Sequence, residues 1–190
     1  MNVRESIFAA IFFLLLLSTG CGQLYRVTPL PKEPVGTIIS TPVNGLEVAA
    51  TALDGDRSLE LFEANLPMAG VLAVEVVIAN RAKMPISLES VRYTLVDPGG
   101  QTTTRLAPEL ALRRVMKFYG NRIYQIDAHR DTVADYHKIA LVERGVVESG
   151  RETRGVLFFA ISRQAPLLSG FSLAVRVDGQ TVSLPLDKTP

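Results

Sequence analysis

The sequence predicts a mainly β protein, an antiparallel β-sandwich with a helical insertion around residues 107–143. Short segments that alternate apolar and polar residues recur along the chain, and two pairs of them are joined by Asn44-Gly45 and Asp178-Gly179. Two-residue hairpin turns need positive φ at both central residues, which Asn, Asp and Gly tolerate best. Short strands at regular spacing, joined by such turns, are typical of antiparallel sandwiches.

Residues 1–20 are expected to be a signal peptide. Arg4 precedes an uninterrupted apolar run, residues 7–17. Spanning a bilayer takes roughly 20 apolar residues, so this run is too short for a stable transmembrane helix and fits the apolar region of a signal peptide. Small residues then lead directly to Cys21, the one cysteine of the chain.

The run Leu17-Ser18-Thr19-Gly20-Cys21 resembles the lipobox of bacterial lipoproteins, usually Leu, a small residue, Gly or Ala, then Cys. Ser18 stands where Leu is commonest. The resemblance implies cleavage between Gly20 and Cys21, a diacylglyceryl group on the thiol and an acyl group on the new amine. Each buried methylene contributes about 0.8 kcal/mol, so two or three chains make attachment effectively permanent.

The lipoprotein resemblance also implies a cellular location. Gly22, not Asp, follows the cysteine, which in Gram-negative lipoproteins directs the protein to the periplasmic face of the outer membrane, if the organism has one. The competing interpretation is a buried cysteine after an uncleaved anchor helix. With lipid on Cys21 no disulfide can form, so the fold must be stabilised by packing.

Charge gives no indication of a nucleic-acid partner. The chain has 20 Lys and Arg against 19 Asp and Glu, and residues 1–20 contain one of each sign. A nearly neutral domain has no bulk attraction for nucleic acid or for an acidic surface. We therefore expect two partners and no nucleic acid. The first is the membrane, which the acyl groups on Cys21 would enter, and the second is another protein of the cell envelope.

Residues 21–34 are expected to form a lipidated tether, and residues 35–190 one domain. Pro29, Pro31 and Pro34 favour an extended polyproline conformation, typical of a semi-rigid stalk. The alternative is a first edge strand lying against the domain.

The first half of the domain is predicted to be β. A hairpin joins Gly36–Val43 to Leu46–Leu53 and pairs Val43 with Leu46, Thr41 with Val48 and Ile39 with Ala50. Ser58–Asn65 fits either a helical turn or an irregular edge.

Two further strands are expected before residue 100. Val71–Ala79 is predicted to be a buried strand. Its even-numbered residues would lie on one face and its odd-numbered residues on the other, the even set being Leu72, Val74, Val76 and Ile78. In Ile86–Val96 the apolar residues change from even to odd positions. This change predicts a one-residue β-bulge near Glu89-Ser90, which would keep both sets on one face. The run 97–100 then fits a tight turn.

Two helices are expected in the insertion. Pro108 suits the first position of a helix, and Asp127 suits an N-cap. The apolar stripes are Leu112, Val115, Met116 and Tyr119 in the first helix and Val133, Tyr136, Ala140 and Leu141 in the second.

The remaining segments return to β. Arg144–Arg154 is predicted to be a loop and Gly155–Ile161 a central strand. The Asp178-Gly179 turn pairs Val175 with Val182, Leu173 with Leu184 and Phe171 with Leu186, which places all six apolar side chains on one face.

Residues 72–100 and the later runs GVLFFAI and FSLAVRVDG resemble immunoglobulin-like (Ig-like) domains of the late-embryogenesis-abundant type 2 and telokin-like groups. In these groups a strand ending in Asn, a short turn containing Pro and a strand ending in Asp-x-Gly recur. The resemblance implies an Ig-like sandwich. It brings no active site with it.

No catalytic residue, cofactor or metal site is expected. His129 and His137 lie about 12 Å apart along a helix, too far to share one ion, and Asp131 and Asp135 alone make a weak site. The loop carboxylates Glu143, Glu148 and Glu152 fit solvation better than catalysis. A cryptic metal-binding or hydrolytic site in 127–152 is the third of three functional hypotheses.

The leading hypothesis is a non-enzymatic envelope lipoprotein whose Ig-like domain binds another envelope component, through a sheet edge or the insertion. The second is a carrier that holds a lipid or other amphiphile between the sheet and the helices. A basic cluster could contact an anionic lipid surface or simply be a solvated face. Its expected contact residues are Arg113, Arg114, Lys117 and Arg122, with Arg105 and Arg130 nearby in sequence.

Overall fold

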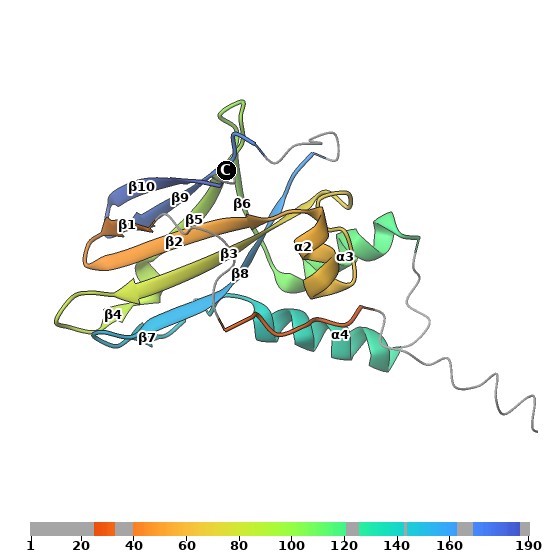
Figure 1. The fold of residues 1–190 in the computed structure, drawn as a ribbon, viewed down its shortest axis with the longest axis horizontal. Coiled ribbons are helices and arrows are strands. Elements are labelled where there is room, and N and C mark those ends of the chain that lie inside the picture. Colours follow the sequence, from red (N-terminus) through yellow and green to blue (C-terminus); the bar gives the residue numbers. More distant parts are fainter. Residues whose placement is uncertain (1–24, 33–39, 121–125, 143, 163–168, 187–190) are drawn as a thin grey trace, which may run out of the picture.

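The computed structural model describes residues 25–32, 40–120, 126–142, 144–162 and 169–186. A single eight-stranded antiparallel sheet forms its centre, in the order β1-β2-β3-β8-β6-β5-β9-β10 (Figure 1). The sheet curls so that its edge strands β1 and β10 lie side by side. The prediction of a mainly antiparallel β fold is confirmed, but the architecture is one nearly closed sheet and not two clearly separate sheets.

The strands are short, as their spacing predicted. The bounds in the large sheet are β1 Ser40–Val43, β2 Leu46–Leu53, β3 Val71–Asn80, β5 Arg92–Val96, β6 Thr102–Leu106, β8 Glu152–Ala160, β9 Ser172–Val177 and β10 Gln180–Pro185. Two further strands, β4 (Ile86–Ser87) and β7 (Val146–Val147), pair with each other.

Both predicted hairpins form in the predicted register. Val43 pairs with Leu46 across the first turn, where Asn44 and Gly45 have φ of 45° and 78°. Val175 pairs with Val182 across the second, where Asp178 and Gly179 have φ of 47° and 87°. Positive φ at both positions is what a type I′ turn requires. Residues 36–39 of the expected first strand, with the Ile39–Ala50 pair, lie outside the described residues.

Three segments differ from expectation. The expected β-bulge is instead a 3₁₀ turn, η2 (Leu88–Ser90), which brings the apolar residues before and after it into one core. The expected loop 144–154 contains β7 and the start of β8. The strand β6 was not predicted. Of the two alternatives for 58–65, the helical one is correct in part: the helix α2 (Gly55–Phe62) begins earlier, after Asp54, whose side chain accepts a hydrogen bond from the Arg57 N–H.

β3 separates two hydrophobic cores because its side chains alternate between the faces of the sheet. The first face packs inside the curled sheet against residues of β5, β8, β9 and β10. It consists of Leu72, Val74, Val76 and Ile78, as the alternation predicted. Val71 and Ala73 point the other way, into a second core shared with the helices.

The helices cover the outer face of β2, β3 and β8 (Figure 1). α3 (Pro108–Phe118) has Pro108 in its first turn, and α4 (Ile126–Ile139) follows it, so the predicted helical insertion is confirmed. Leu112, Val115 and Met116 of α3 are buried in the second core, whereas Tyr119 is 42% exposed. Among the described residues, no helix has the length and apolar character needed to cross a bilayer.

Candidate functional site

Residues 25–32, here called the strap, run in extended form across the helical layer, alongside α4 (Figure 1). The Thr28 N–H donates to the carbonyl of Leu61 at 2.8 Å. The Arg26 N–H donates to Glu63 Oε2 at 3.1 Å. The extended form predicted for the tether is present, but these residues lie against the domain and do not form a free stalk. Gly20 and Cys21 lie outside the described residues.

Tyr25 fixes the beginning of the strap. Its side chain is 7% exposed and belongs to the second core. Its ring centroid lies 6.1 Å from that of Tyr119, and the Tyr119 hydroxyl accepts a hydrogen bond from the Asn65 N–H at 3.0 Å. The start of the strap, the C-terminal end of α3 and the loop after α2 therefore form one unit.

Arg154 of β8 fixes the other end of the strap. Its guanidinium donates to the carbonyl of Pro31 and, at 3.3 Å, to that of Lys32. The same guanidinium forms an ion pair with Glu75 of β3. The strap is therefore held at both ends by groups that belong to the domain.

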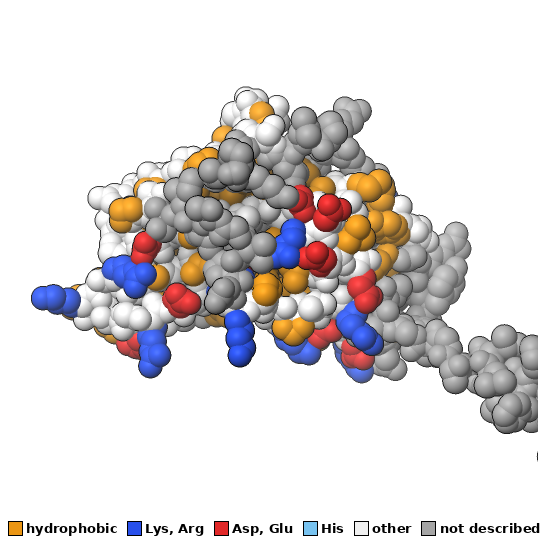
Figure 2. Space-filling model, viewed as in Figure 1, with side chains coloured by type: hydrophobic (Ala, Val, Ile, Leu, Met, Phe, Trp, Pro, Cys, Tyr) orange, Lys and Arg blue, Asp and Glu red, His pale blue; other side chains and the backbone are white. Residues whose placement is uncertain are grey.

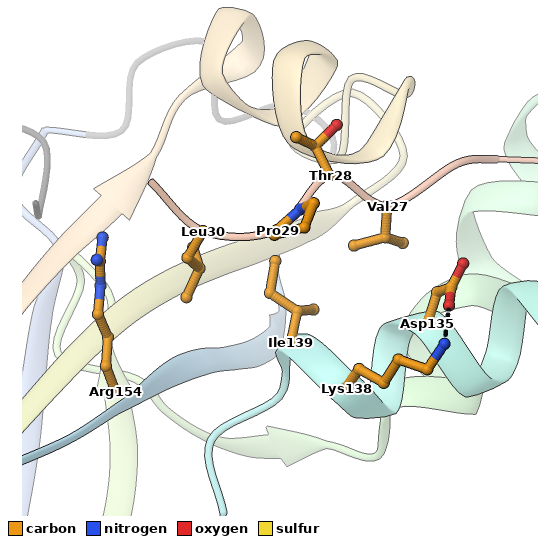
Figure 3. Close-up of a pocket in the computed structure, with 8 residues that line it drawn as sticks. All are labelled: Val27, Thr28, Pro29, Leu30, Asp135, Lys138, Ile139 and Arg154. Atoms are coloured by element: carbon orange, nitrogen blue, oxygen red, sulfur yellow. Dashed lines mark hydrogen bonds and ion pairs between the residues drawn. The ribbon is translucent and has the colours of Figure 1, made fainter. Parts of the chain in front are cut away.

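A groove of about 330 Å³ lies between the strap and α4 (Figure 3). Leu30 and Ile139 face each other across it, and the Asp135–Lys138 ion pair, at 2.7 Å, lies at its rim. The complete lining is Val27, Thr28, Pro29, Leu30, Asp135, Lys138, Ile139 and Arg154. The space expected for an amphiphile, between sheet and helices, is packed with core side chains such as Leu112 and Phe158.

The predicted basic cluster is brought together only in part. Arg113, Arg114 and Lys117 are exposed on α3, and these three are here called the basic face of α3. Arg122 lies outside the described residues. Arg105 lies on β6, in a different groove, and Arg130 of α4 is 3.7 Å from Asp131.

A second groove, here called the arginine groove, has a volume of about 580 Å³. It lies beside the point where β6 pairs with β8 through Arg105 and Leu106. Its lining is Leu88, Glu89, Val91, Arg92, Tyr93, Thr104, Arg105 and Arg144. The floor is apolar, because Leu88, Val91 and Tyr93 are core residues.

The arginine groove concentrates positive charge that the sequence scatters. Arg92, Arg105 and Arg144 come from β5, β6 and the segment after α4, and Glu89 is the one acidic lining residue. Arg92 also lies directly opposite Arg176 in the pairing of β5 with β9. The Arg92 guanidinium donates to the carbonyls of Glu89 and Val91, which holds it at the edge of the groove. No local motif marks these residues, and the sequence did not predict the groove.

His137 and Asp135 of α4 each contact a different side chain and not each other. His137 Nε2 lies 2.6 Å from Glu109 Oε1 of α3. A backbone hydrogen bond and then this contact hold the pKa of Glu109 below its ordinary value. Asp135 pairs with Lys138. Among the described residues no three His, Cys, Asp or Glu side chains are grouped closely enough to bind a metal; Glu143 lies outside them.

Tyr136 of α4 is fully buried between Phe62 and Phe158, with ring centroids at 5.2 and 5.5 Å. Burial raises the pKa of Tyr136. Its hydroxyl has no hydrogen-bond partner in the described part of the chain. The group serves packing, since it is enclosed by the second core.

No protein-family model matches the chain, and no curated protein matches it. Solved structures that are similar to it include two from Bacillus species. The yjhA protein from Bacillus subtilis has 14% identity and a TM-score of 0.45, over 78% of this chain and 96% of that one. A conserved hypothetical protein from Bacillus anthracis has 11% identity and a TM-score of 0.43, over 80% of this chain and 94% of that one.

Proposed function

We propose that this chain is a non-enzymatic envelope lipoprotein, anchored by lipid on Cys21, whose β domain binds another envelope component. The observation that carries the proposal is the lipobox-like run ending at Cys21, only four residues before Tyr25. Because Tyr25 is buried in the domain, lipid on Cys21 would hold the folded domain next to the membrane. A domain held there meets envelope components at high effective concentration.

The arginine groove is the proposed binding site for that component. It combines an apolar floor with three arginines from separate elements. Arginine binds carboxylate and phosphate groups through paired hydrogen bonds. The partner is therefore expected to present an anionic group beside apolar surface. We also propose that the domain is a variant of an Ig-like sandwich in which the two layers have joined into one curled sheet; the antiparallel hairpins are a feature that it shares with such sandwiches.

A carrier function is the second candidate, favoured by the groove between the strap and α4. Its volume of about 330 Å³ lies at the lower end of the range for ligand pockets. Leu30 and Ile139 would contact the apolar part of an amphiphile, and Lys138 would lie near its head. Native mass spectrometry of the protein purified from cells would detect such a ligand as added mass.

Anchoring is tested by labelling cells with radioactive palmitate and by fractionating them. The wild-type chain is expected to take up label and to sediment with membranes. Cys21→Ser should lose both properties, whereas Ser18→Leu, which restores the commonest lipobox residue, should keep both. Absence of label from the wild type, or unchanged fractionation of Cys21→Ser, would overturn the anchoring.

Partner binding is tested by crosslinking in intact cells. A photoreactive residue in place of Thr104, an exposed residue that lines the arginine groove, should give a discrete crosslinked product. The same residue in place of Met84, which is 72% exposed, serves as the control. Arg92→Glu combined with a crosslinker at Thr104 should abolish the product. A product that persists with Arg92→Glu would assign the partner to another surface.

A further inference from the structure

We infer that one particular end of the domain faces the bilayer and contacts anionic lipid headgroups. This end consists of the C-terminal half of α3 with its basic face, Tyr119, and the loop that follows α2, residues 63–70. It is here called the membrane end. The inference rests on the proposed lipidation of Cys21, and adds to it an orientation and a lipid-contacting surface.

The short connection to the anchor restricts the orientation. Four peptide units separate Cys21 from Tyr25, and a fully extended chain spans at most about 3.6 Å per residue, so the two lie within roughly 14 Å of each other. Headgroups occupy roughly 5–8 Å of each leaflet, so crossing them takes up about half of the distance that the chain from Cys21 to Tyr25 can span. Tyr25, which is 7% exposed, must therefore lie close to the headgroup surface.

A series of contacts connects Tyr25 to the rest of the membrane end. Its ring lies 6.1 Å from the Tyr119 ring, and the Tyr119 hydroxyl accepts from the Asn65 N–H. The Asn65 side chain in turn accepts from the Met68 N–H at 3.1 Å. Whatever surface lies beside Tyr25 therefore includes Tyr119 and the loop that carries Met68.

The membrane end exposes apolar side chains. Tyr119 is 42% exposed and Met68 is 56% exposed. Figure 2 shows hydrophobic side chains gathered on the surface over α3 and the neighbouring loop. Tyrosine is enriched where proteins meet the headgroup layer, because its ring is apolar and its hydroxyl is polar. Such a surface fits partial insertion among headgroups.

Charge on the same helix fits an anionic surface. Arg113, Arg114 and Lys117 are exposed on α3, immediately before Tyr119. Basic residues near a membrane are attracted to anionic lipids over about one Debye length, roughly 8–10 Å. The basic face lies within one helical turn or two of Tyr119, so the tether brings it into that range. Lipid attachment and charge thus favour the same orientation.

The orientation determines which part of the domain points away from the membrane. β3 begins directly after the loop that carries Met68 and has 10 residues, which span about 33 Å. The loop after β3 carries Met84 and lies at the opposite end of the domain (Figure 1). Met68 and Met84 are therefore two exposed methionines on opposite ends of one strand.

This pair of methionines provides a matched experiment. The chain contains no tryptophan, so Met68→Trp and Met84→Trp each introduce a single tryptophan fluorophore. Each full-length variant is produced in cells, purified with its lipid, and inserted into vesicles of phosphatidylcholine and phosphatidylglycerol with brominated acyl chains. Brominated lipid is expected to quench Met68→Trp several-fold more strongly than Met84→Trp. Equal quenching, or stronger quenching of Met84→Trp, would overturn the orientation.

The contribution of charge is measured in the same vesicles. Neutralising the basic face with Arg113→Gln, Arg114→Gln and Lys117→Gln should reduce the quenching of Met68→Trp, as should omission of phosphatidylglycerol. Unchanged quenching in both cases would overturn the anionic-lipid contact. Intact mass separates the two proposals: a chain without lipid would overturn both, whereas lipidated protein with equal quenching would overturn only the orientation.

Discussion

The carboxylate of Glu75 on β3 forms an ion pair with the guanidinium of Arg154 on β8, on the face of the sheet that the helices cover. The two side chains are only 4% and 16% exposed. Because the same guanidinium donates to the carbonyls of Pro31 and Lys32, one cation joins two central strands to the strap. Stability and the position of the strap are therefore coupled at Arg154.

Replacing Glu75 with Gln should destabilise the domain strongly. The variant leaves the Arg154 guanidinium largely buried without its counter-charge, and breaking a buried pair in this way costs about 3 kcal/mol or more. Urea unfolding measures the loss. Glu47→Gln is the matched control, because it breaks an exposed pair with Arg81 at 2.7 Å, which is worth at most about 1 kcal/mol. Similar losses in the two variants would contradict the structural role of Glu75.

Replacing Tyr25 with Ala should release the strap. The variant removes a buried ring from between the strap and α3, and truncation of a large buried aromatic side chain costs about 3–5 kcal/mol where the neighbours cannot relax. Arg26 and Lys32 are exposed sites for trypsin, so cleavage in the strap should accelerate. Thr28→Ala changes an exposed side chain in the same strap and should leave the rate unchanged. An unchanged rate of cleavage in Tyr25→Ala would contradict the role of Tyr25 in holding the strap.

Local chemistry explains what the sequence predicted well. The two hairpin turns depend on Asn44-Gly45 and Asp178-Gly179, whose positive φ is a local property. In Val71–Asn80, likewise, whether a residue number is odd or even is enough to predict the face of the sheet on which its side chain lies. Asp54 is different, because aspartate favours both turns and helix N-caps: it follows the last residue of β2, Leu53, and is the N-cap of α2.

Features that depend on distant pairing could not be predicted in the same way. β6 has the sequence TTTRL, without apolar alternation, and is a strand because it pairs with β5 and β8. Gly155 allows the chain after α4 to approach β8; a Cβ there would lie 2.4 Å from the Leu141 Cα. The arginine groove likewise joins Arg92 to Arg144, which no short motif connects. The basic face of α3 was predictable because it lies within one helix.

Replacing Glu109 with Gln should change the pH dependence of stability. Hydrogen bonds from the backbone and then from His137 lower the pKa of Glu109 in the folded state, from an ordinary value of 4.5. The folded protein thus releases this proton at lower pH than the unfolded chain, so the carboxylate stabilises the fold above pH 4.5 and loses this effect as the pH falls through the lowered pKa. Both side chains are about half exposed, which limits the effect to less than about 1 kcal/mol.

The check on Glu109 is a series of melting curves from pH 7 to pH 3. Glu109→Gln should melt below the wild type at pH 7, and the two curves should converge at the acid end. Glu148→Gln, at an exposed position between β7 and β8, controls for the loss of one negative charge. A constant difference between Glu109→Gln and wild type at every pH would contradict the pKa assignment.

Replacing Tyr136 with Phe should stabilise the domain. The Tyr136 hydroxyl is buried without a hydrogen-bond partner among the described residues, and an unsatisfied buried polar group costs about 1–3 kcal/mol. The ring contacts with Phe62 and Phe158 remain, so the gain should be about 1 kcal/mol, measured by urea unfolding. Tyr119→Phe provides the opposite case, because the Tyr119 hydroxyl accepts a hydrogen bond from the Asn65 N–H at 3.0 Å. This variant should lose a comparable amount of unfolding free energy. Destabilisation by both substitutions would mean that the Tyr136 hydroxyl has a hydrogen-bond partner.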